Sequence, residues 1–295
     1  MWTLLLVGCA VAQFNSTPPL PPGLQLAFSD NFEGSGLDRS KWSVDVDCWG
    51  GGNLEQQCYV DHPDVIRVGD GVLHLDPQFV ESGYQLTSSD ACNSDKPGAC
   101  TGRLPIRSGR IHSLPSRGFG YGRFEMRAQL PRGNYLWPTF WLLPTEERFG
   151  PWPASGEVDI MEVKGSDPEE VGFTLHHGGP YPHNLYFAQT FRVPGLGSDY
   201  HTFGVDWDSE GFRFFVDATY IHHVATKNHN WNNPNQPPPQ SYSSPGQPWT
   251  EARFYMVLNL AVAGNFFGPG WKFDPQRDAS TWNQPFLVDY IKVYQ

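Results

Sequence analysis

The sequence predicts an all-β protein built as a sandwich of antiparallel sheets. Short apolar or alternating segments recur along the chain with turn signals between them, which is typical of sandwiches. The chain contains 31 Gly and 27 Pro, as expected for many turns and loops. No amphipathic helix of useful length stands out. The 295 residues suffice for one large β domain and leave too few for a second.

The N-terminal part is expected to lie outside this domain. Residues 1–12 form an apolar run that ends in Ala10-Val11-Ala12, a small-residue cleavage pattern, so they are predicted to be a secretory signal peptide. Residues 13–25 should be an extended, poorly ordered, Pro-rich leader, in which Asn15 opens a glycosylation sequon. The domain proper is predicted over residues 26–295. No segment is long enough to span a bilayer, so we expect a secreted, extracellular protein without a membrane partner.

Cysteine usage supports export. Removal of the signal would leave four cysteines, Cys48, Cys58, Cys92 and Cys100. An even number in a secreted chain predicts two disulfides. Proximity in the sequence favours Cys48–Cys58 and Cys92–Cys100, although four cysteines allow three connectivities. The alternative is a zinc site, but the spacings match no finger pattern.

Strand patterns are clearest from residue 122 onward. The segments with these patterns are 122–130, a hairpin of 201–208 and 211–218, 254–262 and 286–294. Two long polar loops, 85–105 and 227–249, interrupt the pattern, and loops of this length are usually functional or disordered. The second either rims a binding cleft with Trp231 or is a mobile surface loop.

The most informative feature is an acidic strand. Glu157, Asp159 and Glu162 lie in a short apolar run, where ionised carboxylates are costly unless they are paired. Side chains alternate along a strand, so Glu157 and Asp159 share a face but Glu162 would turn to the other. One extra residue near Ile160-Met161, a β-bulge, brings all three acids to one face. Two such carboxyls about 5–5.5 Å apart are the arrangement of a retaining glycosidase. The alternative, a solvated acidic edge strand, does not fit the apolar neighbours.

Charge and aromatic content indicate the kind of ligand. The formal net charge is −11, which disfavours nucleic acid and sulfated polysaccharide as partners. The chain is 15% aromatic and has 11 Trp. A neutral ligand with faces that stack on rings, such as a glucan, fits both observations.

The segment Trp152-Pro-Ala-Ser-Gly-Glu157-Val-Asp-Ile-Met-Glu162 resembles the signature of glycoside hydrolase family 16. Its spacing is similar to that of the laminarinase-like branch, which carries the bulge, and residues 121–141 also match this family. The resemblance extends over residues 26–295. It implies a β-jelly-roll sandwich of two curved antiparallel sheets with a concave substrate cleft, and it implies no required cofactor. It also implies that Glu157 is the nucleophile, Asp159 its helper and Glu162 the acid/base.

The resemblance also implies several residues that bind the sugar or a metal. These are Trp137 and Trp152 beside the scissile bond, Trp141, His176 near the acid/base, Asn53 as a contact to a sugar hydroxyl, Asn259 as either a buried amide or a cleft residue, and Asp289, a position that binds structural calcium in some members. His177 stands where the family has an aromatic residue, so we expect a changed subsite there. A metal site of His176, His177 and His183 is disfavoured, because adjacent strand residues face opposite sides.

We therefore expect a secreted, monomeric, retaining endo-β-1,3-glucanase that acts on laminarin-like β-glucans by double displacement. One alternative is a non-catalytic β-1,3-glucan-recognition protein, whose class shares the architecture but has lost catalytic acids. The other is a related agarase or carrageenase, which the net charge disfavours.

Overall fold

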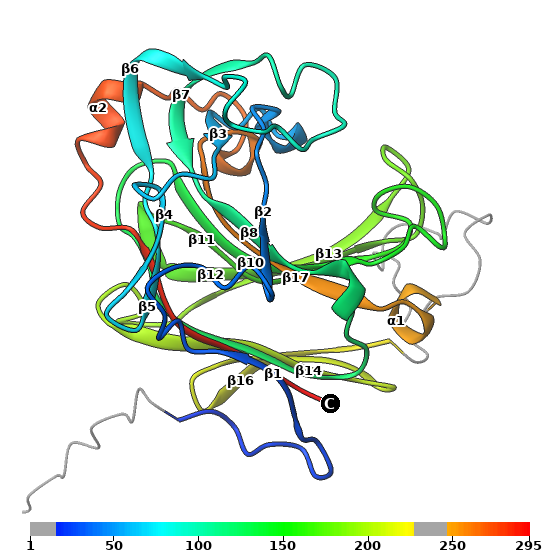
Figure 1. The fold of residues 1–295 in the computed structure, drawn as a ribbon. Helices are drawn as coiled ribbons and strands as arrows, with labels where there is room; N and C mark the ends of the chain where they lie inside the picture. The colour runs from blue at the N-terminus through cyan, green and yellow to red at the C-terminus, as the bar shows by residue number, and fades with distance from the viewer. Residues whose placement is uncertain (1–15, 227–246) are drawn as a thin grey trace, which may run out of the picture.

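The computed structural model describes residues 16–226 and 247–295, which form two large sheets packed face to face with a small third sheet at one end (Figure 1). The predicted signal peptide, Asn15 and Trp231 lie outside the described residues. Among the described residues, no helix has the length and apolar character needed to cross a membrane.

The first large sheet has eight strands. In order these are β16 (Thr219–Ala225), β15 (Gly211–Val216), β14 (Tyr200–Asp208), β9 (Gly122–Gln129), β18 (Phe286–Tyr294), β5 (Val72–Leu75) and β4 (Ile66–Gly69), with β1 (Leu26–Asp30) also paired to β18. All of its strand pairs are antiparallel. The predicted hairpin is confirmed as β14–β15, and the strand predicted at 286–294 is β18.

The second large sheet has seven strands, also antiparallel. In order these are β13 (Leu185–Arg192), β12 (Asp167–His177), β11 (Glu157–Lys164), β10 (Leu136–Pro144), β17 (Phe254–Val262), β8 (Arg110–Ser113) and β2 (Trp42–Val44). The acidic segment is thus a central strand, β11, with β12 on one side and β10 on the other. The predicted all-β sandwich is confirmed.

In the described part of the chain, the remaining elements form the small third sheet, three 3-10 turns and two short helices. They are the small sheet of β3 (Gln57–Tyr59), β7 (Arg103–Ser108) and β6 (Gln78–Gln85), the 3-10 turns η1 (Gly50–Gly52), η2 (Pro115–Arg117) and η3 (Asn265–Phe267), and the helices α1 (Gln247–Glu251) and α2 (Pro275–Ala279).

The hydrophobic core fills the space between the two large sheets and fixes which face of the second sheet is free. In β10, Phe140 and Leu142 are fully buried in this core together with Met126 of β9. Because strand side chains alternate, Trp137 and Trp141 point to the opposite face of the sheet. We call this opposite face, which also carries the three acids, the catalytic face.

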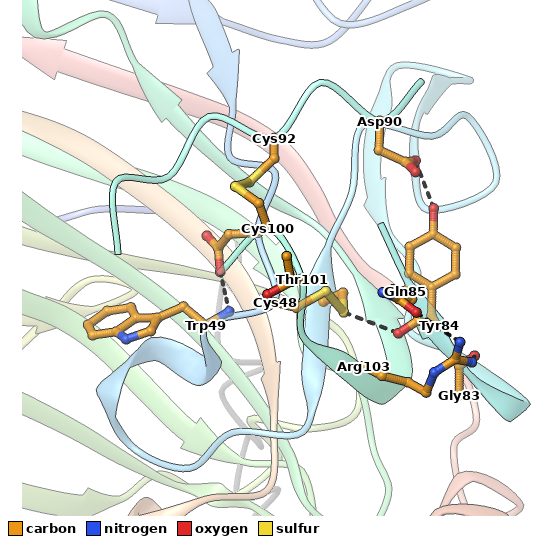
Figure 2. Close-up of a disulfide and its surroundings, with 12 residues drawn as sticks. Cys48, Trp49, Gly83, Tyr84, Gln85, Asp90, Cys92, Cys100, Thr101 and Arg103 are labelled. Carbon is orange, nitrogen blue, oxygen red and sulfur yellow. Dashed lines mark hydrogen bonds between the residues drawn. A yellow bond between two sulfur atoms is a disulfide. The ribbon is translucent and has the colours of Figure 1, made fainter. Parts of the chain in front are cut away.

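Both disulfides join residues near the small sheet. Cys48 is bonded to Cys58 and Cys92 to Cys100, which confirms the pairing by proximity and excludes the zinc alternative (Figure 2). Between Cys92 and Cys100 the chain is also tied to the second sheet, because the Asn93 side chain accepts from the Val46 amide and donates to the carbonyl at the end of β2, both at 2.8 Å. The first long loop is therefore anchored at several points.

The leader is anchored as well, contrary to the expectation of poor order. The Arg123 guanidinium of β9 donates to the carbonyls of Pro18 (2.6 Å) and Pro19 (3.2 Å). The same group pairs with Asp206 at 2.7 Å, and both side chains are almost completely buried. The expectation is wrong from Ser16 onward, because a cation more than a hundred residues away binds the proline carbonyls.

Candidate active site

The predicted β-bulge is present in β11. In the pairing with β10, Met161 lies opposite Phe140 and Asp159 lies opposite Trp141, so Ile160 is the extra residue. The ladder with β12 shifts over the same stretch, between Asp159 and Glu162. The extra residue restores the parity, and all three acids share the catalytic face.

Each glutamate accepts hydrogen bonds from neutral donors. The Trp152 indole N–H donates to Glu157 Oε2 at 2.6 Å. Glu162 accepts from the Trp137 indole N–H on Oε1 and from the Thr174 hydroxyl on Oε2, both at 3.2 Å. Trp137 and Trp152 therefore lie beside the two glutamates, and their place beside the scissile bond stays a prediction. Thr174 was not predicted, although it lies two residues before His176 and so shares its face.

His176 lies among the three acids. It is paired with Glu157 across β11–β12, and its Nε2 is 3.4 Å from Asp159 Oδ2 and 3.8 Å from Glu157 Oε1. The expected position was near Glu162, and His176 does act on the charge of Glu162. Strand register sets its backbone opposite Glu157. Among the described residues, Glu157, Asp159 and His176 form the one group with metal-ligand spacing, its atoms lying within 4.8 Å of one another. The disfavoured His176, His177 and His183 set is not such a group.

Burial governs the electrostatics of the acids. It raises the pKa of Glu157 to about 8, with the charge of Asp159 as the next cause. It also raises the pKa of Asp159 well above its ordinary value, and the charge of Glu162 adds to this. The pKa of Glu162 is raised for the same first reason. Three negative charges so close together and so little hydrated are unfavourable, so the site holds at least one proton near neutral pH.

Asn259 was predicted to be either a buried amide or a cleft residue. Its amide is buried and it lies on the catalytic face, so both descriptions apply. Its Oδ1 accepts from the Trp141 indole N–H at 2.7 Å, and its Nδ2 donates to the Tyr59 hydroxyl at 3.1 Å. Arg110 lies over the Trp141 ring, 4.9 Å from its centroid. Trp141 is therefore held by protein groups on both its edge and its face.

Asn53 follows η1, next to the end of β17. Its side-chain amide donates to Glu55 at 3.3 Å, and Gln57 donates to the same carboxylate at 2.6 Å. Burial raises the pKa of Glu55. Asn53 itself is partly exposed, so it can reach a ligand. Glu55 is a buried acid that sequence reasoning did not single out.

His177 does not face the acids. It is buried, its ring meets Trp249 edge to face at 5.9 Å, and burial lowers its pKa to about 4. The expectation that it changes a subsite is wrong, because His176 takes the catalytic face and the next residue must take the other.

Asp289 has a protein partner of its own. Its carboxylate accepts from Arg127 at 2.5 Å. Among the described residues, no group of side chains with metal-ligand spacing includes Asp289. A calcium ion at Asp289 stays a prediction, and nothing below depends on this ion.

Comparison with known proteins identifies the family. The family model "Glycosyl hydrolases family 16" matches residues 80–253. A glucan endo-1,3-beta-glucosidase of Cryptopygus antarcticus is 34% identical, covering 91% of each chain. A beta-1,3-glucan-binding protein of Penaeus monodon is 30% identical over 86% of this chain and 79% of its own length. The laminarinase of Rhodothermus marinus superposes with a TM-score of 0.71 at 30% identity, covering 92% of this chain and 97% of that one.

Proposed function

Because the chain belongs to glycosyl hydrolase family 16, we propose that it is a secreted, retaining endo-β-1,3-glucanase that cleaves laminarin-like β-glucans. The observation that carries the proposal is the bulged strand β11, which presents Glu157, Asp159 and Glu162 on one face. Endo-1,3-β-glucanase relatives and laminarinase neighbours support this substrate class.

The two glutamates divide the reaction between them. Glu157 attacks the anomeric carbon and forms a covalent glycosyl-enzyme, while Glu162 gives its proton to the leaving oxygen. Glu162 then takes a proton from the incoming water, which displaces Glu157 and restores the original configuration. The raised pKa of Glu162 suits a group that must begin protonated.

Glu162 begins the reaction protonated, and Asp159 is the best residue to hold a second proton. Glu157 accepts from the neutral Trp152 N–H, whereas the described contact of Asp159 is with His176, at 3.4 Å. A protonated Asp159 removes the neighbouring charge that raises the pKa of Glu157. Asp159 can then donate to Glu157 and keep the nucleophile ionised.

Trp137, Trp152 and Trp141 supply ring faces for the sugar, with Asn53 and His176 as polar contacts, as the family resemblance implies. Their place on or beside the catalytic face supports these roles. Two disulfides suit an oxidising compartment, which supports secretion. A soluble monomer that needs no cofactor remains our expectation.

The rival is a glucan-binding protein without activity, and the Penaeus monodon relative gives it weight. Retention of all three acids, each buried or half-buried among its partners, favours the enzyme. Buried ionisable groups with raised pKa values lower the stability of the folded protein, and such groups are found mainly at catalytic sites.

The deciding experiment is reducing-sugar release from laminarin, lichenan and agarose. We expect wild type to release sugar from laminarin and Glu157→Gln to be inactive while it still binds, with the exposed Glu146→Gln as a matched control of full activity. NMR of the first product should show the β-anomer. Binding of laminarin without release would favour the recognition protein, release from agarose alone would refute the substrate class, and an inverted product would refute the assigned roles.

A further inference from the structure

Three exposed aromatic side chains gather on one side of the acids. Trp152, Tyr181 and Tyr186 are 43%, 71% and 67% exposed. Single exposed rings are ordinary on a protein surface, but a contiguous group marks a binding site. The rings form a row with His176: the centroids are 6.2 Å apart for Tyr181–Trp152, 5.8 Å for Trp152–His176 and 5.9 Å for His176–Tyr186.

Strand register puts Tyr186 in line with the nucleophile. Glu157 pairs with His176 across β11–β12, and His176 pairs with Tyr186 across β12–β13. Neighbouring strands lie about 4.8 Å apart, so the Tyr186 backbone is about 10 Å from that of Glu157 along a line across the sheet. Tyr186 shares the catalytic face, whereas the next residue, Phe187, turns toward the core and stacks with Phe173.

Tyr181 extends the row from the loop between β12 and β13. Its backbone N–H donates to the Trp152 carbonyl at 3.1 Å, which fixes this loop to the tryptophan that contacts Glu157. β13 is the edge strand of the second sheet. A polymer that crosses β11 and β12 therefore passes over Tyr186 as it leaves the protein.

The two sides of the acids differ in chemistry. Toward β10 and β17, Trp141 and Asn259 belong to a hydrogen-bonded network that extends to Tyr59. Toward β13, the described groups are mainly ring faces. A rigid polar network suits the sugar that stays bound as the glycosyl-enzyme. Ring faces bind many saccharides and release them easily, which suits the part that departs.

We propose that Tyr186, together with Tyr181, forms a platform for the leaving-group side of the glucan and for an incoming acceptor saccharide. This inference rests on the proposed function. When a saccharide replaces water, its hydroxyl attacks the anomeric carbon and gives its proton to Glu162. Glu157 departs as a carboxylate, and a new glycosidic bond forms.

The test is the ratio of transglycosylation to hydrolysis, measured by mass spectrometry of products from laminari-oligosaccharides. Loss of a ring contact worth about 1.4 kcal/mol corresponds to about a tenfold change. Tyr186→Ala should lower the ratio by about that factor, and Tyr186→Phe should preserve it. Gln189→Ala, an exposed residue of β13 on the opposite face, is the matched control and should leave it unchanged.

An unchanged ratio in Tyr186→Ala, with active wild type, overturns the platform and leaves the proposed function intact. If Tyr186→Ala leaves the ratio of transglycosylation to hydrolysis constant but changes the length of the products on the non-reducing side of the cleaved bond, the assignment to the leaving-group side is overturned. If wild type releases no sugar from laminarin, the proposed function fails and the acceptor platform fails with it. A smaller drop in Tyr186→Phe than in Tyr186→Ala identifies the ring rather than the hydroxyl as the binding group.

Discussion

Replacing Glu157 by Gln should make the folded protein more stable, by an amount that grows with pH. Burial, the main cause, and the neighbouring Asp159 raise the pKa of Glu157 from 4.5 to about 8 in the folded state. A raised carboxyl pKa means that folding disfavours the ionised form. Wild type therefore loses stability as pH rises from about 4.5, the value of the unfolded chain, to about 8. Gln has no proton to lose, so the variant escapes this loss.

The size of the effect follows from the same two values. A gap from 4.5 to about 8 corresponds to at most about 5 kcal/mol, at about 1.4 kcal/mol per pH unit. A proton on Asp159 removes part of the cause and makes the measured gain smaller. The gain should be near zero at pH 4, rise between pH 5 and 8, and stay level above that.

Guanidinium unfolding followed by tryptophan fluorescence, at pH values from 4 to 9, measures this gain. Glu146→Gln, an exposed substitution of the same chemistry, should show no such rise. A gain in Glu157→Gln that is equal at pH 4 and pH 8, or that shrinks as pH rises, would refute the reasoning from buried charge.

Three further changes test other parts of the structure. Trp152→Phe removes the N–H that lowers the pKa of Glu157, so the acidic limb of the kcat/KM profile should move to higher pH. The value of kcat/KM should fall about tenfold, as expected for the loss of a hydrogen bond to a charged group. An acidic limb that does not move would contradict this. His177→Phe removes a buried group whose pKa is lowered by folding from 6.5 to about 4, so the variant should gain up to about 3 kcal/mol of stability relative to wild type as pH falls from 6.5 to about 4. Its KM should not change. A changed KM would show that His177 does reach substrate. Arg123→Met leaves the buried Asp206 without its cationic partner, although Tyr220 still donates to it, and should lower the free energy of unfolding by about 3–5 kcal/mol in urea. A loss below about 1 kcal/mol would mean that the ion pair contributes no more than an exposed one.

The catalytic strand could be predicted because its signal is local. Parity along six residues is enough to infer the bulge, and apolar runs such as 254–262 mark buried strands without any knowledge of their neighbours. The same alternation places His177 on the core side of β12. The expectation of a changed subsite at His177 is wrong because the family pattern takes no account of this alternation.

What the sequence did not predict depends on partners far along the chain. Asn259 remained ambiguous because its second partner, Tyr59, is 200 residues away. The leader seemed free because Arg123, which holds it, lies in a distant strand. Tyr186 was missed since β13 is an exposed edge strand whose burial does not alternate cleanly, so it has no clear apolar period.

The order of strands in the second sheet also bears on how such a protein can change. A glucan laid across the strands meets a different strand at each step, with β11 near the middle and β13 and β2 at the two edges. Under the proposed function, the residues that meet successive sugars would come from different stretches of sequence. Substrate length and branching can be altered at an edge strand or its loop while the residues that break the bond stay untouched. Because the acids and the edge strands are separate parts of the sheet, the length of glucan that the enzyme binds and the chemistry of cleavage can evolve separately.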